Sequence, residues 1–107
     1  MEVAQYDVIL VTLDPTIGSE MKKTRPCVII SPQEMNRVLN TLIIAPITNT
    51  RGTIPTRIHM QSGKVNGWIV LDQVRTIDRK RVIKKIHVLS DKEISKIKQV
   101  LKEMLVE

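Results

Sequence analysis

The sequence is built mainly from short apolar runs rich in Val and Ile, each bounded by proline, glycine or polar residues. β-branched side chains favour strands, and runs of this length are typical of them. We therefore expect strands over residues 7–13, 27–31, 41–48, 56–60, 68–74 and 82–88. The run V-I-L-V in the first of them indicates a strand buried on both faces. Pro46, inside the third, predicts a sheet edge or a bulge.

Helical signals are confined to two places. Residues 33–39 have the spacing of one helical turn, whereas residues 61–67 and 76–79 are interpreted as turns. Near the C-terminus, Ser90 and Glu93 have the spacing of a capping box, Leu89 can close on Ile94 as a hydrophobic staple, and apolar residues recur at helical spacing as far as Leu105. At 107 residues the chain has the size of one domain. We predict a mainly β (α+β) fold, a small and strongly bent sheet or open barrel of six to seven short strands with a C-terminal helix.

Composition indicates how the core is filled and in which compartment the protein works. Tyr6 and Trp68 are the only aromatic residues apart from histidine, so aliphatic side chains must fill the core. The lone cysteine, Cys27, excludes an intramolecular disulfide, fits a reducing compartment and is expected to be an inert core thiol. No apolar run approaches the roughly 20 residues that a membrane-spanning helix needs, and the first residues lack the features of a secretion signal. We expect a cytoplasmic protein.

Positive charge is concentrated in the second half of the chain. The net charge is +6; residues 1–53 carry five Lys or Arg and five Asp or Glu, whereas residues 54–107 carry twelve and six. The densest stretch is 75–85, where six cations accompany Asp78 as the only acid. A charge run is often only a solvated face, but this excess favours a surface for a polyanion such as nucleic acid.

The stretch K-K-T-R-P-C-V-I-I-S, residues 22–31, joins a cationic segment to an apolar run. Pro26 biases Arg25 toward an extended conformation, so the strand is expected to start here and to leave Arg25 where loop gives way to sheet. A guanidinium held there can bind an anion, although an ordinary surface arginine would have the same sequence context.

No P-loop, dinucleotide fingerprint, zincin motif or cysteine pair is present. His59 and His87 are interpreted as half-exposed strand residues rather than metal ligands or bases. We expect neither a metal nor another cofactor. If the chain is an enzyme, its polar groups at strand–loop junctions are Arg25, Thr48, Asn49, Asp72, Gln73 and Arg75.

Several motifs together resemble the MazF/PemK-like toxins of bacterial type II toxin–antitoxin systems. In order they are D-V-I-L-V-T-L-D-P-T-I-G-S-E, K-T-R-P-C-V-I-I-S, N-R, A-P-I-T-N-T and L-D-Q-V-R-T-I-D-R-K-R. The resemblance implies an SH3-like barrel with a C-terminal helix that forms a homodimer. It also implies an mRNA interferase, a ribosome-independent and sequence-specific endoribonuclease acting on single-stranded RNA. An acidic antitoxin protein would neutralise it by laying an extended segment across its surface.

Carried over by position, the resemblance implies that Arg25 and Thr48 are catalytic. Arg25 would stabilise the charge that gathers on the phosphate when the ribose 2′-OH attacks, without a metal, and Thr48 would hold the phosphate. The RNA-binding residues would be Ser19, Lys22, Lys23, Asn49, Thr50, Arg51, Asp72, Gln73, Arg75, Arg79 and Lys80.

The chain departs from the pattern at two positions. Some relatives carry His at the position of Ser19 and Arg at that of Val70, so mechanisms that use those side chains do not transfer unchanged. Asp72 is interpreted either as catalytic or as structural, tying down Arg75 or a backbone amide. The segment 14–24 is expected to be a loop that is mobile in the free protein and orders over RNA.

Two other functions fit a small β barrel. A CcdB-like poison of gyrase would bind a protein and cut nothing, but those toxins depend on a Trp-Gly-Ile C-terminus and this sequence ends Leu-Val-Glu. A nucleic-acid-binding barrel without catalysis is the other alternative.

Overall fold

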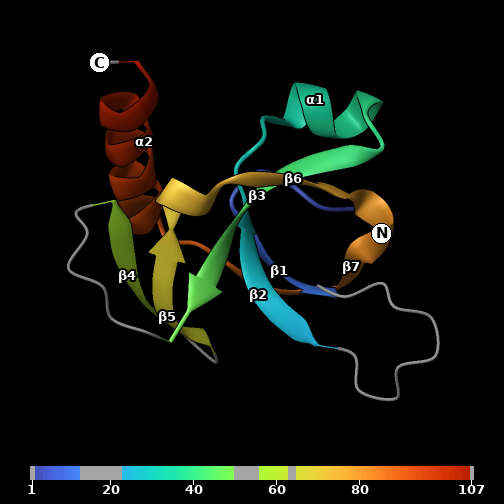
Figure 1. Ribbon diagram of the computed structural model, residues 1–107, viewed down its shortest axis with the longest axis horizontal. Helices are drawn as coiled ribbons and strands as arrows, with labels where there is room; N and C mark the ends of the chain where they lie inside the picture. Colours follow the sequence, from blue (N-terminus) through green and yellow to red (C-terminus); the bar gives the residue numbers. More distant parts are fainter. Residues whose placement is uncertain (1, 13–22, 50–55, 63–64, 107) are drawn as a thin grey trace.

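The structure, a computed structural model, describes residues 2–12, 23–49, 56–62 and 65–106 (Figure 1). Its strands are β1 (Asp7–Thr12), β2 (Thr24–Ile29), β3 (Thr41–Thr48), β4 (Arg57–Ser62), β5 (Val65–Val70), β6 (Arg75–Asp78) and β7 (Val82–Val88). The helices are α1 (Gln33–Val38) and α2 (Asp91–Leu105), and two 3₁₀ turns are η1 (Leu71–Gln73) and η2 (Arg79–Arg81). Within these residues, seven strands form one antiparallel sheet, which confirms the predicted fold class.

Strand β3 organises the sheet, whose order is β4-β5-β3-β2-β1-β7. One side of β3 pairs with β2, while the other pairs first with β6, through Thr41–Ile44, and then with β5, from Ile47 onward. Pro46 lies where β3 changes from one partner to the other. The prediction that Pro46 marks a sheet edge or a bulge is therefore wrong: β3 is central, and the missing N–H falls in the gap between two pairings.

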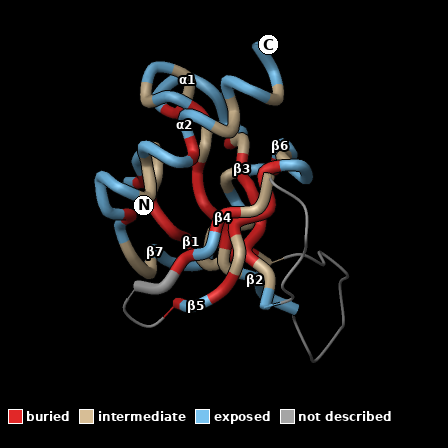
Figure 2. Tube along the Cα trace, turned by 90° about the vertical axis from the view of Figure 1, so that its left-hand side faces the viewer, coloured by how far each residue is buried: buried red, intermediate tan, exposed pale blue. Residues whose placement is uncertain are grey.

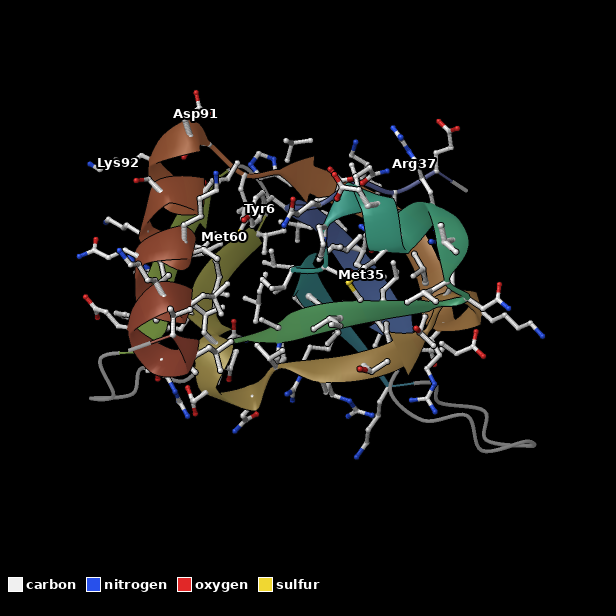
Figure 3. The ribbon with its side chains drawn as sticks, turned by 90° about the horizontal axis from the view of Figure 1, so that it is seen from above. Tyr6, Met35, Arg37, Met60, Asp91 and Lys92 are labelled. Carbon is white, nitrogen blue, oxygen red and sulfur yellow. The ribbon has the colours of Figure 1, made fainter. Side chains whose placement is uncertain are left out.

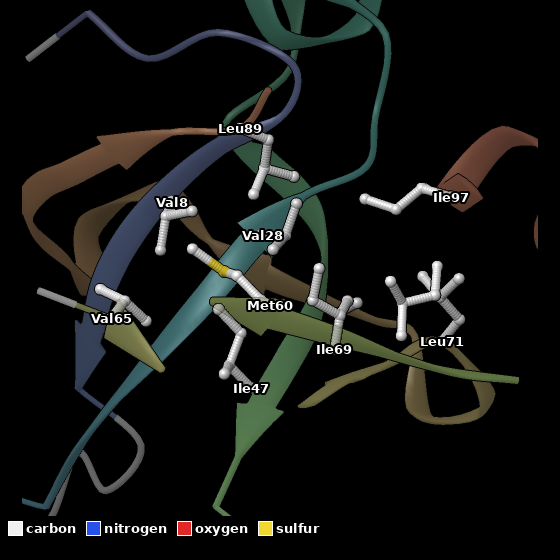
Figure 4. Packing of buried hydrophobic residues seen from close by; sticks show 11 residues of the cluster. Val8, Val28, Ile47, Met60, Val65, Ile69, Leu71, Leu89 and Ile97 are labelled. Carbon is white, nitrogen blue, oxygen red and sulfur yellow. The ribbon is translucent and has the colours of Figure 1, made fainter. Parts of the chain in front are cut away.

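The central strands are buried on both faces, as the run in β1 predicted. Val8 belongs to one core cluster and Ile9 and Val11 to the other. The first cluster lies between the sheet and α2 (Figure 4), and buried residues run through the middle of the strands (Figure 2). The aliphatic core expected from the scarcity of aromatic residues is thus divided into two layers by the sheet.

Helix α2 begins as the sequence predicts. The Ser90 amide donates to Glu93 Oε1 at 3.0 Å and the Glu93 amide donates to Ser90 Oγ at 3.2 Å, which completes the capping box. Ile97 is the fully buried residue of this helix and packs in the first core cluster. The two helices lie at opposite ends of the sheet (Figure 3), and neither is long and apolar enough to cross a membrane.

Several predicted boundaries are wrong. Strand β2 begins at Thr24, so Arg25 lies within a strand and not in the loop before it. On the other side of β2, β3 pairs only with Cys27–Ile29. One side of Pro26 is therefore unpaired, and its missing N–H breaks no hydrogen bond there. The predicted turn over residues 61–67 is largely strand, because Gln61 and Ser62 of β4 pair with Asn66 and Val65 of β5.

The region after β5 also differs from the prediction. The expected strand over 68–74 ends at Val70 and is followed by η1. Residues 76–79, predicted as a turn, lie mostly in β6, which pairs with Thr41–Ile44. That pairing is a long-range contact, and the local sequence carries no signal for it.

Candidate active site

A cavity of about 190 Å³ opens between β2, β3 and β6. It is lined by Arg25, Cys27, Ile44, Pro46, Gln73, Arg75 and Ile77. The register explains this grouping, because directly paired residues present their side chains on the same face of a sheet. Cys27 pairs with Pro46, and Ile44 pairs with Arg75. Three residues predicted from the sequence are thereby brought together from two distant segments: Arg25 on β2, and Gln73 and Arg75 in the stretch that joins η1 to β6.

The cavity has a cationic rim over an apolar floor. Arg25 and Arg75 are exposed, whereas Cys27 and Ile44 are buried. Burial raises the pKa of the Cys27 thiol to about 11, and the nearby charges of Arg25 and Arg75 oppose that rise. The thiol is therefore protonated near neutral pH. It lines the floor of the cavity and is not a nucleophile, in agreement with the predicted inert core thiol. The guanidinium groups of Arg25 and Arg75 both lie near the Cys27 thiol, so the rim of this cavity is suited to bind an anion.

Thr48 lies close to this cavity without lining it. It continues the row of Ile44 and Pro46 on β3, two residues beyond Pro46 and on the same face. Arg25 stands likewise two residues beyond Cys27 on β2, and the pairing of β2 with β3 ends at Cys27 and Pro46. Asn49 follows β3 and is exposed. The two residues implied to be catalytic therefore lie on the same face of neighbouring strands, beyond the point where β2 and β3 stop pairing and diverge (Figure 1).

Strand β5 comes unusually close to Thr48. A β-carbon at Gly67 would lie 2.7 Å from the Thr48 carbonyl oxygen, which is nearer than side-chain atoms normally approach. Glycine at this position lets β5 pair tightly with the end of β3, and so helps to fix the backbone of Thr48.

Asp72 makes contacts that the sequence did not predict. Its Oδ1 accepts a hydrogen bond from Thr56 Oγ1 at 2.9 Å and lies 3.8 Å from Arg57 Nε. The expected tie to Arg75 is not the contact observed. Asp72 instead joins η1, which carries Gln73, to the start of β4. Thr56 and Arg57 were not among the predicted site residues, because only the tertiary structure brings them to Asp72.

Two predicted RNA-binding cations lie elsewhere. The Arg79 guanidinium donates to the backbone carbonyls of Asn36 and Leu39, which ties η2 to α1, so Arg79 lines a separate cavity of about 510 Å³. Lys80 is exposed on η2, with its amide bonded to Asp78. The predicted basic stretch is thus divided, and Arg79 in particular is not brought to the cavity that holds Arg25.

Other predicted site residues fall at or outside the described part of the chain. Lys23 is exposed immediately before β2. Ser19, Lys22, Thr50 and Arg51 lie outside the described residues, as does nearly all of the segment 14–24 that was expected to be mobile.

The histidines lie in strands, as predicted. His59 is exposed on β4 and its ring stacks on Trp68, with centroids 4.8 Å apart and a tilt of 34°, and His87 is half-buried on β7. Among the described residues, no three His, Cys, Asp or Glu side chains are grouped as metal ligands would be.

Comparison with known proteins decides the family. Residues 4–105 match the family described as the PemK-like, MazF-like toxin of type II toxin–antitoxin systems. The chain belongs to this family. It is 36% identical over 97 residues to a protein named endoribonuclease MazF from Staphylococcus saprophyticus, in an alignment that covers 85% of this chain and 81% of that one. The family membership implied by the five motifs is confirmed.

Solved structures of an endoribonuclease and of MazF proteins share the fold. An endoribonuclease in complex with its cognate antitoxin from a mycobacterial species superposes with a TM-score of 0.84 at 21% identity, covering 98% of this chain and 96% of that one. MazF from Deinococcus radiodurans gives 0.80 at 20% identity over 98% and 97%. A MazE–MazF complex from the same organism gives 0.83 at 20% identity over 97% and 96%.

Proposed function

We propose that this toxin is a sequence-specific, ribosome-independent endoribonuclease, an mRNA interferase that cleaves single-stranded RNA. The observation that carries the proposal is the convergence of Arg25, Arg75 and Gln73 around one cavity, with Thr48 beside it. The name of the staphylococcal relative supports the same activity. Residues 1–107 would act as one domain, in the cytoplasm where mRNA is found.

The chemistry follows from the groups at the cavity. The ribose 2′-OH attacks the adjacent phosphorus, the bond to the 5′ oxygen of the next nucleotide breaks, and the products carry a 2′,3′-cyclic phosphate and a 5′-hydroxyl. Negative charge develops on the phosphoryl oxygens in the transition state, and guanidinium groups stabilise it. Arg25 performs this role because its guanidinium group presents a positive charge and several N–H donors to the phosphoryl oxygens. Thr48 donates its hydroxyl to a phosphate oxygen, while Arg75 and Gln73 hold the neighbouring part of the strand.

Asp72 acts in this scheme as a positioning residue. Its contacts with Thr56 and Arg57 hold η1 against β4, so that Gln73 faces the cavity. We further propose that an acidic antitoxin inhibits the toxin by occupying the cationic rim, since two of the similar solved structures contain an antitoxin.

The test is incubation of the pure protein with a long single-stranded RNA in EDTA, followed by analysis of the ends. We expect cuts at a short recognition sequence, with cyclic phosphate and 5′-hydroxyl termini. A non-catalytic RNA-binding barrel would retard the RNA without cutting it, and a gyrase poison would do neither. Loss of all cleavage in EDTA, restored by a divalent cation, would contradict the metal-independent mechanism.

The toxin is expected to form a two-fold symmetric homodimer with RNA lying across both copies. At the end of α2, Met104 packs against the first core cluster, whereas Leu105 is 72% exposed. Val38 at the end of α1 and Leu39 after it are also exposed, to 79% and 43%. Burying such apolar surface is favourable. Sedimentation should show a dimer at micromolar concentration, and a monomer alone would remove the idea.

A further inference from the structure

Three side chains form a row across the sheet beside the candidate active site. Thr48 on β3 pairs with Trp68 on β5, and Trp68 pairs with His59 on β4. Strands β4 and β5 and the end of β3 lie side by side on the left in Figure 1. Neighbouring strands are separated by about 4.8 Å, so the indole ring stands one strand away from the threonine implied to hold the phosphate.

The row faces away from the first core. The adjacent row in the same register, Ile47, Ile69 and Ile58, is buried in the cluster beneath α2. Because side chains alternate between faces, Thr48, Trp68 and His59 point to the opposite face. This is also the face of Ile44 and Pro46 in the cavity lining. The aromatic pair and the cavity residues of β3 therefore lie on the same face of the sheet.

Core packing does not account for the aromatic pair. Trp68 is only half-buried, and His59 is exposed. Within the described residues, Trp68 is absent from both core clusters and from the partly buried side chains that pack against them. The ring of His59 covers one side of the indole at 4.8 Å. An indole supported from one side and accessible to solvent is suited to stacking with another flat group.

We propose that Trp68, supported by His59, stacks on a base of single-stranded RNA next to the phosphate held at Thr48. Every nucleobase has a π-face, and proteins that bind single strands use aromatic side chains as stacking platforms. A stacked base fixes the nucleotide that carries it, and so places the scissile phosphate against Arg25. The inference rests on the proposed nuclease function and adds a binding subsite to it.

The chain offers a direct probe, because Trp68 is its only tryptophan. We would titrate the wild-type protein with an RNA containing its cleavage sequence and a single 2′-deoxy nucleotide at the cut bond, which blocks attack. Stacking should quench the Trp68 fluorescence in proportion to binding measured independently by gel retardation. Binding without a change in fluorescence would overturn the proposal.

Two substitutions of Trp68 distinguish stacking by an aromatic ring from contact with any large apolar side chain. Trp68→Leu keeps an apolar side chain but removes the ring, and should weaken binding of the 2′-deoxy RNA by about tenfold or more. Trp68→Phe keeps an aromatic face and should recover most of that affinity. A further set of RNAs each lack one base near the cut bond. When the missing base is the one that stacks on Trp68, wild type and Trp68→Leu should bind that RNA equally. If Trp68→Leu weakened the binding of every RNA by the same factor, Trp68 would act only on the fold.

The two proposals can fail separately. RNA cleavage by wild type that is unaffected in Trp68→Leu, with unchanged fluorescence on binding, would reject the stacking subsite and leave the nuclease function standing. If wild type neither binds nor cuts RNA, both are rejected. The wild-type fluorescence titration decides the question even if a Trp68 variant does not fold.

Discussion

Arg25→Ala is expected to lower the rate of RNA cleavage by about a hundredfold or more while leaving the fold intact. Loss of a charged donor to the transition state costs on the order of 3 kcal/mol, which corresponds to that factor. The folded state should tolerate the change because the Arg25 side chain is exposed at the rim of the cavity. Single-turnover cleavage of a defined RNA measures the chemical step, and thermal denaturation checks the fold.

The matched control is Arg37→Ala. It removes the same charge from an exposed position on α1, which lines the other, larger cavity. We expect it to change cleavage little. Arg25→Lys should recover only part of the activity, since an ammonium group keeps the charge but lacks the two-pronged geometry. Thr48→Ala should be milder than Arg25→Ala, because a neutral hydroxyl contributes less. Near wild-type cleavage by a folded Arg25→Ala variant would refute the assignment.

Ile97→Ala is expected to lower the free energy of unfolding by about 2–5 kcal/mol, the usual range for truncating a fully buried aliphatic side chain. Ile97 is the anchor of α2 in the first core cluster, where its exposed fraction is 0%. A domain of this size has a total stability of only about 5–15 kcal/mol. Urea denaturation followed by circular dichroism gives the measurement.

Gln99→Ala serves as the control for Ile97→Ala, because Gln99 is an exposed residue of the same helix. It should change stability by less than about 0.5 kcal/mol. Because α2 packs on β4 and η1, Ile97→Ala should also loosen the turn that presents Gln73. A loss below about 1 kcal/mol would show that α2 is held mainly by other contacts.

Features with a local cause were predictable from the sequence. The capping box at Ser90 and the helix after it depend on residues within one or two turns, and the structure reproduces both. Strands β3 and β7 have the predicted bounds because each apolar run ends at a turn residue or a change in pattern. The five motifs together indicated the family, and two of them, K-T-R-P-C-V-I-I-S and A-P-I-T-N-T, contain the candidate catalytic residues Arg25 and Thr48.

Tertiary structure alone decided which of those residues meet. Arg75 and Arg79 are four residues apart and look equivalent in sequence, yet pairing of β6 with β3 sends Arg75 to the cavity while Arg79 bonds to α1. Asp72 finds Thr56 and Arg57, and Trp68 finds Thr48, through strand pairings between distant segments. Composition and spacing report local preferences, whereas register between strands follows from which apolar faces can be buried together over the whole sheet. For this protein the residue types and the family were present in the sequence, and the arrangement of the site was settled by the pairing of β3 with its three neighbours.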